Sequence, residues 1–231
     1  MSGRVEVRAL TLDVFGTLLD WRSRIARAFR ESGVQGDPEQ LADLWRARAL
    51  AATQEVNRKQ RPWGSFDELH EVTLSELLDE RRLELPNERR AALLSAWHQL
   101  DPWPGVAAGL ETLRRRRVVA ALSNGNLALL VDLARHGDLR FDCLLSAELA
   151  RVYKPEAEVY LTGARLLGLP PSQVMMVAAH PLDLQGARAA GFRSGFIDRP
   201  LEYGPGSPPR EDPDADISVS DLVGLAAVLQ A

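Results

Sequence analysis

The amino-acid sequence is poor in cysteine, in lysine and in long apolar runs. Its single cysteine, Cys143, excludes an intrachain disulfide and most cysteine-based metal sites. No run is long and apolar enough to predict a membrane-spanning helix, and the first residues lack the apolar region of a signal peptide. The net charge of −4, from 28 basic and 32 acidic residues, does not support a nucleic-acid or anionic-membrane partner. We therefore expect a cytoplasmic, soluble protein that binds neither nucleic acid nor membranes.

Short apolar runs and helical patterns alternate over much of the chain. The apolar runs have the composition of buried parallel strands, and they lie at residues 7–14, 117–124, 173–179, 193–199 and 215–220. Helical segments are expected at about 127–136, 155–167 and 182–190. This alternation predicts right-handed βαβ units, and therefore an α/β fold with a doubly wound parallel sheet.

A block of consecutive helical patterns interrupts this alternation between residues 21 and 100. Within it, Asp37 followed by Pro38 is a good N-cap with proline in the first turn of a helix. We expect residues 1–20 and 101–231 to form the core, and residues 21–100 to form a helical cap over the carboxyl edge of the sheet. The Gly/Pro-rich stretch 203–216 is expected to be a surface loop.

Polar side chains follow each of the first three predicted strands. They are Asp13 and Thr17 after the first strand, Ser123 and Asn124 after the second, and His180 and Asp183 after the third. The carboxyl ends of the strands line the ligand crevice of an open α/β sheet. Helix capping would explain one such end, but the same pattern at three of three strands favours a functional site.

Lys154 is a second indication of a site. The chain contains only two lysines, Lys59 and Lys154, against many arginines. Because a surface cation in this protein is nearly always arginine, a lysine here indicates a need for a compact ammonium group, although chance alone would also explain it. Close to Asp13, the ammonium would keep the carboxylate ionised. The gross attraction is about 4 kcal/mol at about 4 Å and an effective dielectric constant of about 20.

These residues lie in four short motifs, "DVFGT", "LSNGN", "YKP" and "VAAHPLD". In this order and spacing the motifs resemble those of the haloacid dehalogenase superfamily. More narrowly, "TLDVFGTLLD", "YKPEAEVY" and the "LWR" of the helical block resemble the (S)-2-haloacid dehalogenases over nearly the whole chain. The resemblance implies a Rossmann-like hydrolase core with a helical cap and a hydrolase that acts on carbon–halide bonds. It leaves a homodimer open.

Phe15 separates this chain from the phosphatases of the same superfamily. Those enzymes generally carry a second aspartate two residues after the nucleophile, which protonates the leaving alcohol, and they bind Mg²⁺. Phenylalanine cannot donate a proton, whereas a halide leaves as an anion and needs hydrogen-bond donors instead. With Asp183 the one carboxylate near the fourth motif, a Mg²⁺ site is under-supplied. We therefore expect no metal and no cofactor, although Phe15 could also simply pack under the cap helices.

By resemblance, Asp13 attacks the halogen-bearing carbon of a small 2-haloacid and forms an ester, which water hydrolyses to a 2-hydroxy acid. Arg46 corresponds to the cap arginine that takes the halide; a surface salt bridge is the alternative for it and for the nearby Arg48. Ser123, Asn124 and Lys154 correspond to residues that hold the substrate carboxylate or orient Asp13. Thr17 and Asp183 correspond to residues that support the nucleophile, the lysine or the water. Tyr160 corresponds to a substrate-binding tyrosine, although a tyrosine in this helix is more often a core residue.

Two positions depart from the commonest family pattern. Where the fourth motif often reads Ser-Ser-Asn, this chain has Ala178, Ala179 and His180. Ala178 lacks a hydroxyl that would position water, and His180 carries a ring that could donate, accept or titrate near neutral pH. We expect His180 to contact the substrate in a rearranged pocket, and this extends the expected substrates to fluoroacetate.

The remaining histidines and aromatic residues have no comparable context. We expect His70, His98 and His136 to be surface or packing residues, and core packing is the first expectation for Trp63 and Phe66, which could also wall the pocket. Two rival functions stay open: a Mg²⁺-dependent phosphatase acting on a small phosphate ester, and a non-catalytic binding member of the fold.

Overall fold

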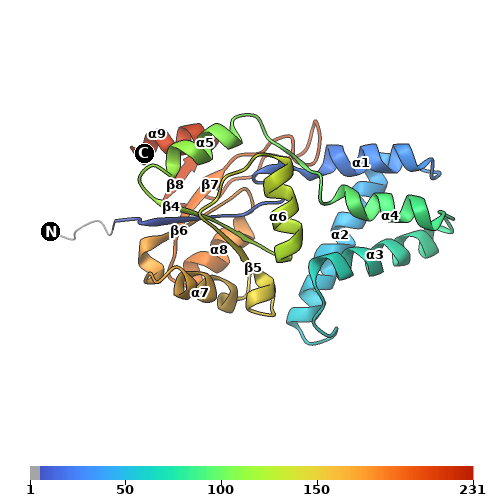
Figure 1. The fold of residues 1–231 in the computed structure, drawn as a ribbon, viewed down its shortest axis with the longest axis horizontal. Helices are drawn as coiled ribbons and strands as arrows, with labels where there is room; N and C mark the ends of the chain where they lie inside the picture. Colours follow the sequence, from blue (N-terminus) through green and yellow to red (C-terminus); the bar gives the residue numbers. More distant parts are fainter. Residues whose placement is uncertain (1–5, 231) are drawn as a thin grey trace.

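A six-stranded parallel sheet forms the centre of the computed structural model, which describes residues 6–230 (Figure 1). The strand order is β5-β4-β1-β6-β7-β8. The strands are β1 (Ala9–Leu12), β4 (Val118–Ser123), β5 (Cys143–Ser146), β6 (Val174–Ala178), β7 (Arg193–Ile197) and β8 (Ile217–Val219). All four residues of β1 are buried, as expected for a strand covered on both faces. The predicted α/β fold with a doubly wound parallel sheet is confirmed.

Helices cover both faces of the sheet. Helices α5 (Val106–Leu113) and α9 (Leu222–Val228) lie together on one side, and α7 (Ala157–Leu166) and α8 (Pro181–Ala189) lie on the other (Figure 1). Helix α6 (Leu127–His136) connects β4 to β5. The strand order reverses at β1, because β4 lies on one side of it and β6 on the other. The ligand crevice of such a sheet lies at this reversal, beyond the carboxyl end of β1.

Four helices lie beside the sheet as a separate group (Figure 1). They are α1 (Trp21–Ser32), α2 (Pro38–Asn57), α3 (Phe66–Arg81) and α4 (Asn87–Ala96). As predicted, Asp37 caps α2, and its side chain accepts a hydrogen bond from the backbone of Gln40. The antiparallel pair β2 (Leu19–Asp20) and β3 (Asp101–Pro102) joins the points where the chain leaves the sheet and returns. The division into a core and a cap of residues 21–100 stays a prediction, and this arrangement supports it.

Aromatic side chains fill the inside of the four-helix group. Trp21, Trp45 and Trp97 are fully buried, and the ring of His70 stacks on Trp97 with 4.1 Å between ring centroids. Burial holds the pKa of His70 well below its usual value. His70 is therefore a neutral packing residue, as expected.

The structure contains several elements that the sequence patterns did not predict. The strand β5 has only four residues, two of them half-buried at the edge of the sheet, so its apolar signal is short. Helices α5 and α9 and the β2–β3 pair were also missed. The stretch 203–216 contains no helix or strand, in line with the predicted loop. Within residues 6–230, no helix combines the length and apolar character needed to cross a membrane.

Candidate active site

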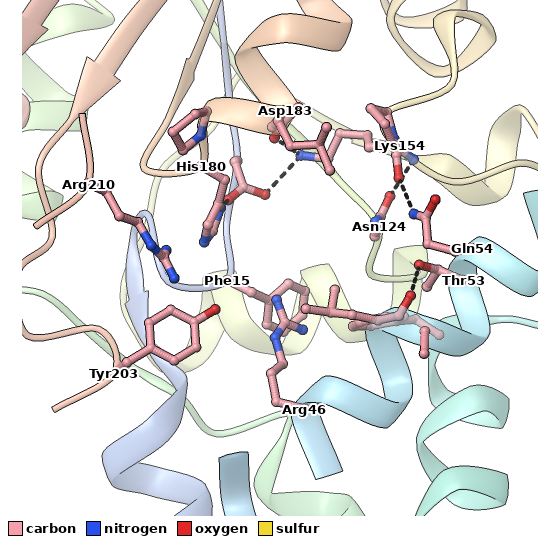
Figure 2. A pocket seen from close by; sticks show the side chains of 17 residues that line it. Phe15, Arg46, Thr53, Gln54, Asn124, Lys154, His180, Asp183, Tyr203 and Arg210 are labelled. Carbon is pink, nitrogen blue, oxygen red and sulfur yellow. Dashed lines mark hydrogen bonds and ion pairs between the residues drawn. The ribbon is translucent and has the colours of Figure 1, made fainter. Parts of the chain in front are cut away.

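A cavity of about 460 Å³ lies beyond the carboxyl ends of β1, β4 and β6, with helix α2 opposite them (Figure 2). Its wall is mostly apolar, as in most small-molecule sites. The acidic and basic residues that line it are Asp13, Arg46, Lys154, His180, Asp183 and Arg210. The structure thus brings the ends of the first three predicted strands together around one cavity.

Asp13, directly after β1, is almost completely buried and is held by three donors. Lys154 Nζ lies 2.9 Å from Oδ1, while Thr17 Oγ1 (2.7 Å) and His180 Nδ1 (3.1 Å) contact Oδ2. Burial alone would raise the pKa of Asp13, but Lys154 and His180 outweigh it and hold the pKa far below its usual value. The carboxylate is therefore held in its ionised form, as a nucleophile requires.

All three N–H donors of the Lys154 ammonium group are used in hydrogen bonds. Besides Asp13, Nζ donates to Asp183 Oδ2 at 2.5 Å and to the carbonyl oxygen of Leu122 at 3.0 Å. Burial lowers the pKa of Lys154, but the two carboxylates more than offset this and raise it. Because an ammonium has three donors, Lys154 has none left for a substrate. It orients Asp13, which is one of the two roles expected for it.

Tyr160 does not line the cavity, and its burial supports the core role that was the alternative to a substrate contact. The ring is fully buried on α7, and its hydroxyl donates to Asp183 Oδ1 at 2.7 Å. Burial and the nearby Asp183 charge raise the pKa of Tyr160, which keeps the hydroxyl protonated as a donor. Both oxygens of Asp183 are therefore occupied, one by Lys154 and the other by Tyr160.

Three residues at the strand ends have different surroundings. Thr17 is buried, donates to Asp13 and accepts from the backbone N–H of Ala179 at 2.9 Å, so it supports the nucleophile. Ser123 is also buried and does not line the cavity; its Oγ accepts from the N–H of Gly125 at 3.1 Å. Asn124 does line the cavity, and its Oδ1 accepts from the backbone N–H of Lys154 at 2.9 Å. This bond leaves the Nδ2 donors of Asn124 for a ligand.

Arg46 reaches the cavity from helix α2, on the side away from Lys154 and Asp183 (Figure 2). Its side chain is only 6% exposed, and neither Nε nor Nη1 finds a hydrogen-bond partner among residues 6–230. Its guanidinium carbon lies 5.3 Å from the ring centroid of Phe15 and 5.6 Å from that of Trp21. Arg48 is different, because it pairs with Glu80 at the surface. An unpaired buried guanidinium beside a cavity is a site for an anion.

Phe15 lines the cavity next to Asp13 and contacts Phe66, with 5.5 Å between the ring centroids. Phe66 is itself a wall residue, whereas Trp63 stacks on Tyr153 away from the cavity. Phe15 therefore combines the two roles predicted for it. It packs under α3, and it places an apolar ring at the position where phosphatases of the superfamily carry a proton donor.

His180 lies between two carboxylates. Nδ1 contacts Asp13, and Nε2 lies 3.0 Å from Oε1 of Glu202. Burial lowers the pKa of His180, but Glu202 and Asp13 outweigh it and raise the pKa to about 9. His180 is thus an imidazolium at neutral pH and not a residue that titrates there.

Glu202, the second carboxylate beside His180, is a residue that the sequence reasoning missed. It is only 1% exposed, and Trp21 Nε1 (3.1 Å) and Arg210 Nη1 (2.7 Å) also donate to it. Tyr203 and Arg210 line the cavity from the stretch expected to be a plain surface loop, so that expectation was incomplete. The guanidinium of Arg210 lies over the ring of Tyr203 (Figure 2).

Gly16 is the sequence signal that is connected with Glu202. Its φ of +82° favours glycine, and a Cβ on Gly16 would lie 2.2 Å from Oε1 of Glu202. A glycine after "DVF" therefore indicates that another group approaches this turn, although the sequence does not say which. No group of three or more histidine, cysteine, aspartate or glutamate side chains that could hold a metal ion occurs in the described part of the chain.

Comparisons with known proteins agree with this geometry. The family model of the haloacid dehalogenase-like hydrolases matches residues 7–191. The (S)-2-haloacid dehalogenase 4A of Burkholderia cepacia is 33% identical to this chain over 203 residues, which cover 85% of this chain and 87% of that protein.

Two solved structures are similar over almost their full length. The L-2-haloacid dehalogenase PA0810 is 44% identical, with a TM-score of 0.92 over 97% of this chain and 99% of that chain. The defluorinating L-2-haloacid dehalogenase Rha0230 is 36% identical, with a TM-score of 0.91 over 97% of this chain and 96% of that chain.

Proposed function

This chain belongs to the haloacid dehalogenase-like hydrolases, and we propose that it hydrolyses small 2-haloacids to 2-hydroxy acids through an ester on Asp13. The observation that carries the proposal is the pairing of two unusual charges across one apolar cavity. Asp13 is a buried carboxylate held ionised, and Arg46 is a buried guanidinium with unpaired donors. A displacement at carbon needs an anionic nucleophile on one side and donors for the departing anion on the other.

In the first step, an oxygen of Asp13 forms a bond to C2 of the acid while the carbon–halogen bond breaks. The electron pair leaves with the halide, and Arg46 donates to this anion. Thr17 and Lys154 orient the carboxylate. Asn124 offers its Nδ2 donors to the substrate carboxylate, and Ser123 holds the turn that presents Asn124. No proton is needed by the leaving group, which is compatible with Phe15 beside the nucleophile.

In the second step, water attacks the carboxyl carbon of Asp13, and the bond between that carbon and the ester oxygen breaks. The 2-hydroxy acid leaves, and the carboxylate of Asp13 is restored with one oxygen from water. The pairing of Asp183 with Lys154 supports Asp13 through this step, since it holds the ammonium in place.

We extend the proposal to fluoroacetate. Fluoride is the smallest halide and the most demanding of hydrogen-bond donors. Among the described residues, Arg46 and Asn124 both offer free donors to one cavity, and a defluorinating L-2-haloacid dehalogenase is 36% identical to this chain. A cytoplasmic location and a homodimer stay predictions; size-exclusion chromatography with light scattering tests the dimer.

Halide release from chloroacetate, bromoacetate, fluoroacetate and 2-chloropropionate, each with and without a chelator, tests the proposed function. We expect activity on several of these acids that the chelator leaves unchanged, together with inactivity of Asp13→Asn. Phosphate release from small phosphate esters with added Mg²⁺, and no halide release, would instead identify a phosphatase.

A further inference from the structure

We propose that His180 is the base of the hydrolysis step and that it becomes a base only when Asp13 is esterified, with Glu202 as its positioning residue. The proposal rests on the proposed function, because it concerns the fate of the ester on Asp13. It gives His180 a role different from the substrate contact expected from the sequence.

The resting protein holds His180 as a doubly protonated ring. Its Nδ1 is 3.1 Å from Asp13 Oδ2, and its Nε2 is 3.0 Å and 3.2 Å from the two oxygens of Glu202. Carboxylate oxygens only accept hydrogen bonds, so both contacts are favourable only when both nitrogens carry a proton. The raised pKa of His180 agrees with this geometry.

The carboxylate of Glu202 is fixed more firmly than an ordinary surface glutamate. Trp21 and Arg210 donate to it, and the missing Cβ of Gly16 makes room for it. Such a group holds an imidazole in one orientation and keeps the proton on Nε2, as the third residue of a catalytic triad does. The reactive nitrogen of His180 is then Nδ1, which faces Asp13.

Asp183, the other candidate base near Asp13, has no free oxygen. Lys154 occupies Oδ2, and the Tyr160 hydroxyl occupies Oδ1. Ala178 in addition offers no hydroxyl for positioning water. Both oxygens of Asp183 are thus engaged by other donors, whereas Nδ1 of His180 has Asp13 itself as its partner.

Ester formation itself releases this acceptor. When Asp13 becomes an ester, its negative charge disappears. The imidazolium then loses one of its two neighbouring anions, the one that faces Nδ1, and its pKa falls. The ring is about a quarter exposed (24%), so the proton can leave to solvent. Glu202 retains the proton on Nε2. Nδ1 then takes a proton from water as the water oxygen bonds to the carboxyl carbon of Asp13.

The remaining transfers balance. In the tetrahedral adduct, the bond between the carboxyl carbon of Asp13 and the ester oxygen breaks, and that oxygen receives the proton held on Nδ1, so the 2-hydroxy acid leaves. The proton of the resulting Asp13 carboxylic acid passes to Nδ1, which restores the imidazolium and the carboxylate. One water is consumed, and the one proton of the overall reaction is released when the halide is. The other charged groups facing this pair are Lys154, Asp183, Arg46 and Arg210.

Glu202→Gln tests the proposal, with bromoacetate as substrate and mass spectrometry of the acid-quenched protein. We expect about one equivalent of bromide per chain to be released quickly, at least 10-fold slower turnover afterwards, and accumulation of the ester on Asp13. Glu211→Gln is the matched control, because it makes the same charge change at an exposed position of the same loop; it should behave as the wild type. If Glu202→Gln fails to fold, His180→Asn should show the same accumulation.

A pH indicator gives a readout that a structural role would not move. In a single turnover of the wild type, proton release should not lag behind halide release. A lag overturns the proposal, as does wild-type turnover without ester accumulation in either variant. If the wild type itself releases no halide and carries no ester, the proposed function fails as well, so the two failures are distinguishable.

Discussion

Replacing Arg46 with methionine should make the protein more stable and less active at once. The guanidinium is buried against the rings of Phe15, Trp21, Phe66 and Trp97, and Nε and Nη1 have no partner in the described residues. Burial lowers the pKa of Arg46, although Tyr203, Glu202 and Asp13 act to raise it. Burial thus disfavours a cation at this position. The charge of Arg46 therefore does not stabilise the fold, and we expect it to bind a ligand.

The size of both effects follows from these contacts. Exchanging buried charges for well-packed apolar groups stabilises proteins by about 1–4 kcal/mol, and the lost cation–π contacts take back about 1–2 kcal/mol. The centres of the two ranges leave a net gain of about 1 kcal/mol, or roughly 2–4 °C in Tm for a domain of this size. A hydrogen bond to a charged group contributes about 1.5–3 kcal/mol, so the displacement step should slow about 10- to 100-fold.

Thermal unfolding and rapid-quench halide release measure the two effects separately. Chloride should raise the Tm of the wild type, since a bound ligand stabilises the folded state, and should leave the Tm of Arg46→Met unchanged. The matched control is Arg48→Met on the same helix, whose partner Glu80 is 62% exposed; it should change stability by less than about 1 kcal/mol. An Arg46→Met protein that is less stable and equally fast would refute the reasoning.

Three further predictions concern the carboxylates and their partners. Asp13→Asn should abolish turnover with the fold intact, and a wild-type single turnover in ¹⁸O-water should place label in Asp13; label in the product alone would contradict the ester mechanism. Lys154→Arg should lose most activity, because three acceptors lie within 3.0 Å of Nζ and a planar guanidinium cannot meet them; a near-normal rate would contradict this. The pKa of His180 is about 9 in the folded protein and 6.5 in the unfolded chain. Protonated His180 therefore stabilises the folded state fully below pH 6.5, and this contribution is lost as the pH rises through 9. Denaturant unfolding of His180→Asn should lack this alkaline decline, and an unchanged decline would disprove the assignment.

The strand-end residues could be predicted because parallel strands impose their placement. Asp13, Asn124, His180 and Asp183 follow three different strands, and the carboxyl ends of neighbouring parallel strands meet at one edge. The sequence therefore indicated that these residues converge. It could not give the direction of each side chain, and Tyr160 consequently points to Asp183 and not into the cavity.

Glu202 could not be predicted for a different reason. It lies in a segment without helical or strand periodicity, 22 residues after His180, and its partner Trp21 is 181 residues away. No local pattern encodes such a contact, because the path of a loop depends on the surface that it packs against. The buried ion pairs of Glu202 with His180 and Arg210 are thus tertiary features that only the folded chain shows.

The proposed displacement draws its two charges from two different parts of the chain. Asp13 follows the sheet strand β1, whereas Arg46 lies on α2. Polar contacts join the two parts at several points: Tyr153 Oη donates to the carbonyl oxygen of Gly64 at 2.6 Å, Asn57 Nδ2 to the carbonyl oxygen of Tyr153 at 2.9 Å, Asn126 Nδ2 to Asp67 Oδ2 at 2.8 Å, and Trp21 Nε1 to Glu202 Oε1 at 3.1 Å.

Trp21 and Glu202 are buried, and Phe15 packs against Phe66 and Trp97 of the four-helix group with 5.5 Å and 6.2 Å between ring centroids. A misplacement of about 1 Å can slow an enzymatic step about 100-fold. These buried contacts fix Arg46 relative to Asp13, so an acid that bridges the two charges must fit the spacing that they set. A cavity of about 460 Å³ with charges on two sides therefore favours small acids.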